Sequence, residues 1–172
     1  PRAGKRREDR EEAAVEKRFV VVGLGLIGGS MALALKGFEG FRIVGVDVSQ
    51  PTLRFAREHG VADEVTEDAG WAVEGADVVM LALHPQGILD FTDVCGVKSA
   101  VMAGAACLPE GVDFIGCHPM AGTEFSGIEH AFAELFRGSH LILTPRETST
   151  QEHQALMERL AEQIGCQDVV RT

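Results

Sequence analysis

Residues 19–47 read FVVVGLGLIGGSMALALKGFEGFRIVGVD, and this stretch decides the fold. Its first four residues are apolar and mostly β-branched, which is typical of a buried parallel strand. Directly after them, Gly23, Gly25 and Gly28 fit the pattern G-x-G-x-x-G. In such a turn the first glycine permits a tight bend, the second lets a pyrophosphate approach the backbone, and the third allows the next helix to pack closely. The stretch therefore predicts a strand, a dinucleotide-binding turn and a helix.

The second half of the same stretch supplies an acidic residue. Residues 42–47 predict a second strand that ends at Asp47, about 20 residues after Gly28. A carboxylate at this spacing can accept hydrogen bonds from the adenosine ribose of a dinucleotide. Val48 and Ser49 follow it and offer no guanidinium for a 2′-phosphate. We therefore expect NAD as the cofactor, with NADP less favoured.

The rest of the chain alternates between predicted strands and helices. Capping boxes at residues 126–129 and 149–152 mark the starts of the last two helices. This alternation predicts a doubly wound α/β fold of the Rossmann type over residues 19–172, with a mostly parallel sheet and helices on both faces. Residues 1–18 are highly charged and are predicted to form a separate N-terminal arm. The predicted strands are residues 19–22, 42–47, 61–66, 77–83, 92–95, 113–117, 139–144 and 168–171, and the later helices are residues 50–59, 97–106, 127–136 and 150–164.

Composition narrows the function classes. A chain of 172 residues with 45% hydrophobic residues is long enough for one domain with a sizeable core. Its net charge of −10 disfavours nucleic acid as a partner, and no apolar run is long enough to span a membrane. The four cysteines form no C-x-x-C pair and no His/Cys ligand pattern. We therefore expect no metal site and a cytoplasmic protein with reduced thiols.

One histidine stands at the expected carboxyl end of a strand. Residues 113–117 predict a strand, and His118 follows it directly. Ligands of doubly wound sheets bind outside the carboxyl ends of the strands, so His118 should face the cofactor. An imidazole beside a nicotinamide can accept the hydroxyl proton of an alcohol while hydride leaves. A packed loop histidine without a chemical role explains this position equally well.

Four motifs carry a resemblance to a known family. They are VVGLGLIGGSMALALK at residues 21–36, DVCGVKS at 93–99, FIGCHPMAGTEFSGIEHAF at 114–132 and HLILTP at 140–145. In this order they resemble the nucleotide-binding domain of the prephenate dehydrogenase family, and the resemblance covers roughly residues 19–171. Such enzymes oxidise prephenate with NAD or NADP and release CO₂, giving 4-hydroxyphenylpyruvate for tyrosine biosynthesis, and some use arogenate.

The resemblance assigns roles to particular residues. It implies that His118 is the base or hydrogen-bond acceptor at the 4-hydroxyl of the substrate, and that Thr123 and Glu124 line the substrate side. Without the family resemblance, the sequence would indicate only that Thr123 and Glu124 are ordinary loop residues before a helix. The cofactor residues that it implies are Gly23, Gly25, Leu26, Ile27, Gly28 and Asp47.

Three departures from the family pattern modify these expectations. Many members have a serine that supports the catalytic histidine where this chain has Gly96. Only about six residues, 86–91, are available to connect the predicted strands at 77–83 and 92–95, fewer than a parallel crossover needs, so we expect a segment to be missing between Phe91 and Thr92. Members also continue into a helical domain that forms a homodimer and supplies cationic substrate contacts. We expect this chain to lack that domain, and to bind NAD with little prephenate turnover by itself.

Two other function classes stay open. One is a different hydroxy-acid or imine reductase on the same fold, against which the HPMAGTE sequence argues. The other is a non-catalytic NAD-binding module. The sequence does not decide between prephenate and arogenate as the substrate.

Overall fold

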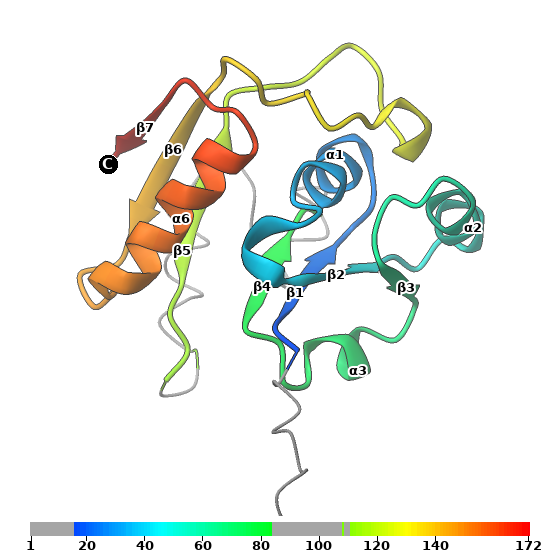
Figure 1. The fold of residues 1–172 in the computed structure, drawn as a ribbon, viewed down its shortest axis with the longest axis horizontal. Helices are drawn as coiled ribbons and strands as arrows, with labels where there is room; N and C mark the ends of the chain where they lie inside the picture. Colours follow the sequence, from blue (N-terminus) through cyan, green and yellow to red (C-terminus); the bar gives the residue numbers. More distant parts are fainter. Residues whose placement is uncertain (1–15, 84–107, 109–110) are drawn as a thin grey trace, which may run out of the picture.

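The structure is a computed structural model that describes residues 16–83, 108 and 111–172 (Figure 1). A four-stranded parallel sheet has the order β3-β2-β1-β4 and contains β1 (Arg18–Val22), β2 (Arg42–Val46), β3 (Glu64–Thr66) and β4 (Val78–Leu81). A three-stranded sheet has the order β5-β6-β7 and contains β5 (Ile115–Pro119), β6 (His140–Pro145) and β7 (Asp168–Arg171). β5 runs antiparallel to β6, whereas β7 runs parallel to it. The doubly wound, Rossmann-type fold predicted from the sequence is confirmed.

Helices cover both faces of the four-stranded sheet. Alternate residues of β1 point to opposite sides, so Phe19 and Val21 enter one hydrophobic cluster and Val20 enters another. α1 and α3 lie on opposite sides of this sheet (Figure 1). Burial of both faces is the normal state of an inner parallel strand and explains why residues 19–22 of β1 are a continuous apolar run. The helices are α1 (Leu26–Ala34), α2 (Gln50–Glu58), α3 (Ala69–Val73) and α6 (Gln151–Gln163), with short 3-10 helices η1 (Phe38–Gly40) and η3 (Ile128–His130).

α6 joins the two sheets through its apolar stripe. Leu160 and Ile164 are buried in the large cluster that contains α1, while Ala161 packs with Leu141 and Leu143 of β6. Full burial of one leucine or isoleucine side chain stabilises a fold by about 1.5–3 kcal/mol. The helix therefore attaches the three-stranded sheet to the rest of the domain.

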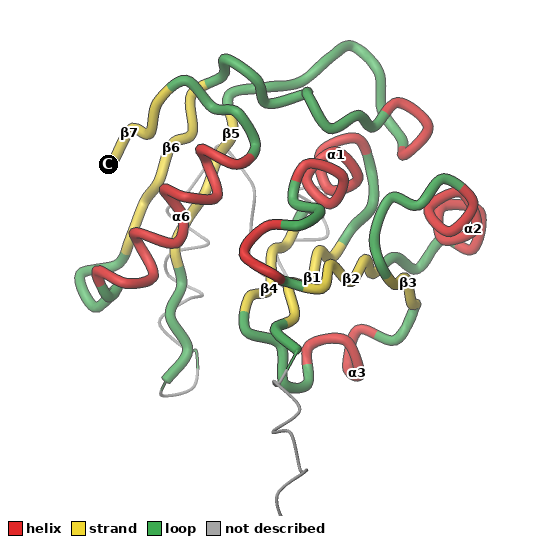
Figure 2. The backbone as a smooth tube through the Cα atoms, viewed as in Figure 1, coloured by secondary structure: helices red, strands yellow, loops and turns green. Residues whose placement is uncertain are grey.

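The predicted helix at residues 127–136 is wrong. The structure has only the short turn η3 there, and Figure 2 shows the segment between β5 and β6 as a loop apart from that turn. Gly127 has a φ of +95°, which is outside the helical region, so the capping box does not form. The amide of Phe132 donates to the hydroxyl of Ser30 on α1 instead of to a helical carbonyl.

Other differences are smaller. α6 is capped by Thr150, one residue after the expected cap, and α3, which begins after Asp68, was not predicted. β5 extends through His118, which was expected just after the strand. The helix expected at residues 97–106, the strand at 92–95 and the gap between Phe91 and Thr92 lie outside the described residues.

The cap of α6 is shifted because Asp113 binds the neighbouring serine. Ser149 donates its hydroxyl to one carboxylate oxygen of Asp113 at 2.7 Å. The other oxygen accepts from the amide of Thr150 at 3.1 Å and lies 2.8 Å from Nδ1 of His153. Burial raises the pKa of Asp113, but these hydrogen bonds outweigh it, so the pKa is lowered overall. Asp113 therefore fixes the start of α6 beside β5 as a carboxylate.

We expect the Asp113→Asn variant to lose about 1–3 kcal/mol of stability at pH 7, because hydrogen bonds to a charged acceptor are lost. A lowered folded-state pKa means that the contribution is present above the ordinary aspartate pKa of about 3.9 and disappears as the pH falls through the folded-state value. Urea unfolding at pH 7 and at pH 3 measures both effects. The difference between wild type and variant should shrink at pH 3. Glu147→Gln, in an exposed turn, is the control. A pH-independent difference contradicts this assignment.

Candidate functional site: a dinucleotide-binding edge

The first glycine of the G-x-G-x-x-G turn has a conformation that other residues rarely adopt. Gly23 has a φ of +91°, and a Cβ atom there would lie 2.5 Å from the carbonyl oxygen of Ala82. Its amide donates to the carbonyl of Val46 at 2.8 Å, which connects the end of β1 to the end of β2. The chain therefore turns sharply at the carboxyl edge of the sheet and enters α1.

Gly25 and Gly28 differ in what surrounds them. A Cβ atom on Gly28 would lie 1.8 Å from the carbonyl oxygen of Gly23 and 3.0 Å from the Cβ atom of Ala82, so α1 packs too closely for a side chain there. A Cβ atom on Gly25 would have no neighbour within 4 Å. Gly25 is also exposed, although its neighbours Leu24 and Leu26 are buried. The backbone at Gly25 is therefore open to a ligand, whereas Gly28 serves packing.

The N-terminus of α1 provides hydrogen-bond donors next to Gly25. Gly25 is the N-cap and has no side chain that could cap the helix, and the first turn of α1 contains no acidic residue. The first intrahelical bond runs from the amide of Gly29 to the carbonyl of Gly25 at 2.8 Å. The amides of Leu26, Ile27 and Gly28 precede that bond and have no helical partner. Amides at a helix N-terminus, together with the helix dipole, suit a phosphate group.

The carboxylate of Asp47 lies beside this turn. One oxygen accepts a hydrogen bond from the amide of Leu24, and the other accepts from the amide of Ser49, both at 2.8 Å. Ser49 in turn caps α2 by accepting from the amide of Thr52. A carboxylate oxygen has a second lone pair, so each oxygen can still accept from a ribose hydroxyl. Two loops thus hold Asp47 in one orientation at the edge where a dinucleotide would lie.

His118, Thr123 and Glu124 lie outside the four-stranded sheet, in β5 of the three-stranded sheet and in the segment that follows it. His118 lies within β5 opposite Ile142 of β6, and its Nδ1 atom is buried with no hydrogen-bond partner in the described part of the chain. Thr123 and Glu124 are exposed in the segment that follows, where the Thr123 hydroxyl accepts from the amide of Phe125 at 3.2 Å. Among the described residues, no hydrogen bond connects these three to the glycine turn or to Asp47.

The structure adds one polar residue that the sequence did not single out. Ser30 of α1 is fully buried and accepts the hydrogen bond from the amide of Phe132 at 3.0 Å. It links the helix of the glycine turn to the segment that carries Thr123 and Glu124. A serine within an otherwise apolar helix was the available signal, because a buried hydroxyl needs a partner.

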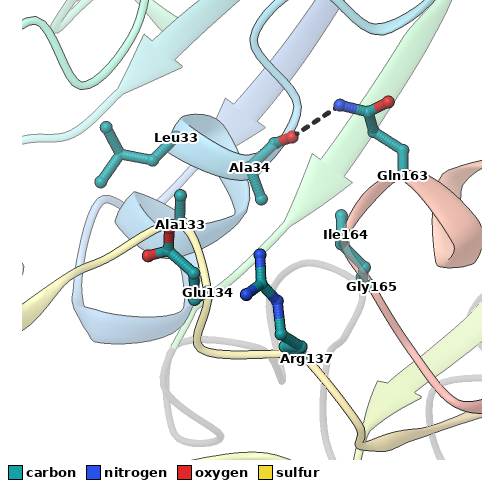
Figure 3. Close-up of a pocket in the computed structure, with 8 residues that line it drawn as sticks. All are labelled: Leu33, Ala34, Ala133, Glu134, Arg137, Gln163, Ile164 and Gly165. Atoms are coloured by element: carbon teal, nitrogen blue, oxygen red, sulfur yellow. Dashed lines mark hydrogen bonds between the residues drawn. The ribbon is translucent and has the colours of Figure 1, made fainter.

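A pocket of about 160 Å³ lies at the C-terminal end of α1, near Ala34, Arg137 and Gln163 (Figure 3). The side-chain amide of Gln163 donates to the carbonyl of Ala34 at 3.1 Å across its rim. This place is separated from Gly25 by the length of α1, so the pocket is distinct from the dinucleotide-binding edge. Within residues 16–83, 108 and 111–172, no cluster of side chains suits a metal ion, and no helix is long and apolar enough to cross a membrane.

The fold and this edge define a dinucleotide-binding domain of the Rossmann type. Sequence comparison gives its relatives: a family profile described as "Prephenate dehydrogenase, nucleotide-binding domain" matches residues 89–170. The chain is 36% identical over 151 residues to a prephenate dehydrogenase of Bacillus subtilis strain 168, covering 78% of this chain and 41% of that protein. The chain is a relative of the prephenate dehydrogenases and corresponds to their nucleotide-binding domain.

Solved structures agree with this relationship. The prephenate dehydrogenase from Aquifex aeolicus in complex with hydroxyphenyl propionate and NAD⁺ has a TM-score of 0.80 at 29% identity, covering 94% of this chain and 61% of that one. An arogenate dehydrogenase from Synechocystis has a TM-score of 0.80 at 33% identity, covering 90% of this chain and 59% of that one. The chain therefore spans between about two fifths and three fifths of the length of the relatives named here.

Proposed function

We propose that this domain binds NAD for the oxidative decarboxylation of prephenate to 4-hydroxyphenylpyruvate, a step of tyrosine biosynthesis. The observation that carries the proposal is the open backbone at Gly25, which lies at the N-terminus of α1 beside the fixed carboxylate of Asp47. The relationship to a prephenate dehydrogenase solved with NAD⁺ supports it. The expected cytoplasmic location and homodimer stay predictions.

Asp47 supports NAD over NADP as the cofactor. Its carboxylate is held by the amides of Leu24 and Ser49, so it cannot turn away from a ligand without losing two hydrogen bonds. A ribose with free hydroxyl groups can donate to it, whereas a 2′-phosphate would bring negative charge against negative charge. We propose that the pyrophosphate binds the amides of Leu26, Ile27 and Gly28 over the exposed backbone of Gly25.

We propose that His118 accepts the proton of the substrate 4-hydroxyl. When bound, NAD supplies the hydride acceptor, and loss of hydride and CO₂ makes the substrate ring aromatic. The proton of the hydroxyl moves to a ring nitrogen of His118 as the carbon–oxygen double bond forms. Thr123 and Glu124 are proposed to contact the substrate. The cationic groups for the two carboxylates of prephenate are expected from a helical domain of the kind that the family resemblance implies.

The proposed reaction is tested by NADH formation in the full-length protein. With prephenate and NAD we expect absorbance of NADH at a rate that depends on enzyme concentration, accompanied by 4-hydroxyphenylpyruvate. The same assay with arogenate in place of prephenate shows which of the two compounds the protein oxidises. Binding of NAD without oxidation of either compound would identify a non-catalytic NAD-binding module and contradict the proposed reaction.

A further inference from the structure

We propose that Ser30 is a positioning residue that couples cofactor binding on α1 to the segment of residues 119–132, which carries Thr123 and Glu124. The inference rests on the proposed function, because it assumes that NAD binds at the N-terminus of α1. Ser30 is not expected to contact NAD or the substrate. Its expected effect is on the ordering of residues 119–132, which carry the proposed substrate contacts.

Ser30 has the environment of a residue that fixes another segment. Among the described residues it is the one buried polar or charged residue, with none of its surface exposed. The amide of Phe132 donates to its hydroxyl at 3.0 Å across a separation of 102 residues in the chain. An unpaired buried donor or acceptor costs about 1–3 kcal/mol. The bond therefore fixes where the segment crosses the helix.

The residue next to Ser30 adds close packing at the same place. A Cβ atom on Gly29 would lie 2.9 Å from the Cβ atom of Ala131 and 3.4 Å from a side-chain carbon of Ile128. Ile128 is buried in the cluster that includes Met31 of α1 and Leu35, the C-cap of that helix. Figure 1 shows the segment between β5 and β6 crossing α1 toward α2. The contact thus combines Gly29 and the buried hydroxyl of Ser30, which are neighbours on α1, with the buried side chain of Ile128 on the crossing segment.

The two ends of this coupling lie within one short helix. The amides proposed to bind the pyrophosphate belong to residues 26–28, and the contacts with the segment begin at Gly29 and Ser30. A ligand that holds the first turn of α1 also restricts the next residues, because consecutive helical residues share hydrogen bonds. Cofactor binding should therefore strengthen the bond from Phe132 to Ser30 and order residues 119–132. By thermodynamic reciprocity, a substrate that orders this segment should also tighten NAD binding.

Amide hydrogen exchange of the wild-type chain, with and without saturating NAD, tests this inference. The amides of residues 24–28 report binding, and those of β7 report general stabilisation of the fold. Relative to β7, we expect NAD to slow exchange at residues 120–132 by about fivefold or more, the lower end of ordinary coupling. In Ser30→Ala, NAD should still protect residues 24–28, while the extra protection of residues 120–132 disappears.

Ser139→Ala is the matched control. Ser139 is a half-buried serine whose hydroxyl donates to the carbonyl of Phe136 at 2.7 Å, and among the described residues it forms no hydrogen bond with α1. This variant should keep the full NAD-dependent protection of residues 120–132. If NAD protects residues 24–28 of wild type but not 120–132, or if Ser30→Ala keeps the protection of 120–132, the inference is wrong and the proposed function stands. If NAD protects neither region, both fail. If Ser30→Ala does not fold, the wild-type experiment can still overturn the inference, because absence of NAD-dependent protection at residues 120–132 contradicts the coupling itself.

Discussion

Replacement of His118 by asparagine is expected to lower kcat for prephenate oxidation by about 10²–10⁴-fold, the usual contribution of a general base. The affinity for NAD should remain nearly unchanged, since His118 lies in β5 and the candidate cofactor residues lie at the ends of β1 and β2. Asparagine keeps a polar side chain of similar size but cannot accept the proton. The expected signature is therefore a loss in kcat with little change in NAD binding.

Steady-state kinetics of the full-length protein with prephenate and NAD measure this effect. His59→Asn is the control, because His59 stacks on Phe55 at the end of α2, with ring centroids 3.9 Å apart. Its kcat should stay near that of wild type. A near-normal kcat in His118→Asn would remove His118 from the mechanism and leave it as a packed histidine of β5.

Alanine at Gly28 is expected to lower the stability of the fold, whereas alanine at Gly25 is expected to weaken NAD binding. Gly28→Ala places a Cβ atom 1.8 Å from the carbonyl oxygen of Gly23, so α1 must move away from the turn. Overpacking of this kind costs about 1–3 kcal/mol and occasionally more. Gly25→Ala adds a methyl group with no protein atom within 4 Å, and its free energy of unfolding should change by less than about 1 kcal/mol. The same methyl group lies where the pyrophosphate is proposed to approach.

Unfolding by denaturant and calorimetric titration with NAD separate these two roles. We expect Gly25→Ala to unfold nearly as wild type does and to bind NAD at least about tenfold more weakly, a change of 1.4 kcal/mol. Gly28→Ala should unfold at clearly lower denaturant concentration. Wild-type NAD affinity in Gly25→Ala would place the pyrophosphate elsewhere, and wild-type stability in Gly28→Ala would contradict the close packing of α1.

The sequence predicted the parts of the fold that depend on local rules. The turn at Gly23 and the Ser49 cap of α2 are each specified by a few neighbouring residues, and the structure has both. Residues 127–136 were predicted as a helix because their capping box is also a local pattern. Its failure has a tertiary cause: the amide of Phe132 binds Ser30, 102 residues earlier.

The candidate site was predictable to a similar extent. The sequence spacing alone predicted that Asp47 lies beside the glycine turn, and in the structure its carboxylate accepts a hydrogen bond from the amide of Leu24. The position of His118 inside β5 was not predictable, because the end of a strand depends on pairing with a distant partner, here β6. Ser149 was displaced as the cap of α6 by Asp113 for the same kind of reason, since that contact spans 36 residues.

Calorimetric titration of the wild-type chain with NAD and with NADP under identical conditions tests the proposed cofactor site most directly. The central claim is that the turn at residues 23–28 and the carboxylate of Asp47 form an NAD site. We expect saturable binding of one NAD per chain, and weaker binding of NADP because its 2′-phosphate meets the fixed carboxylate of Asp47. Absence of NAD binding, or tighter binding of NADP than of NAD, would contradict it.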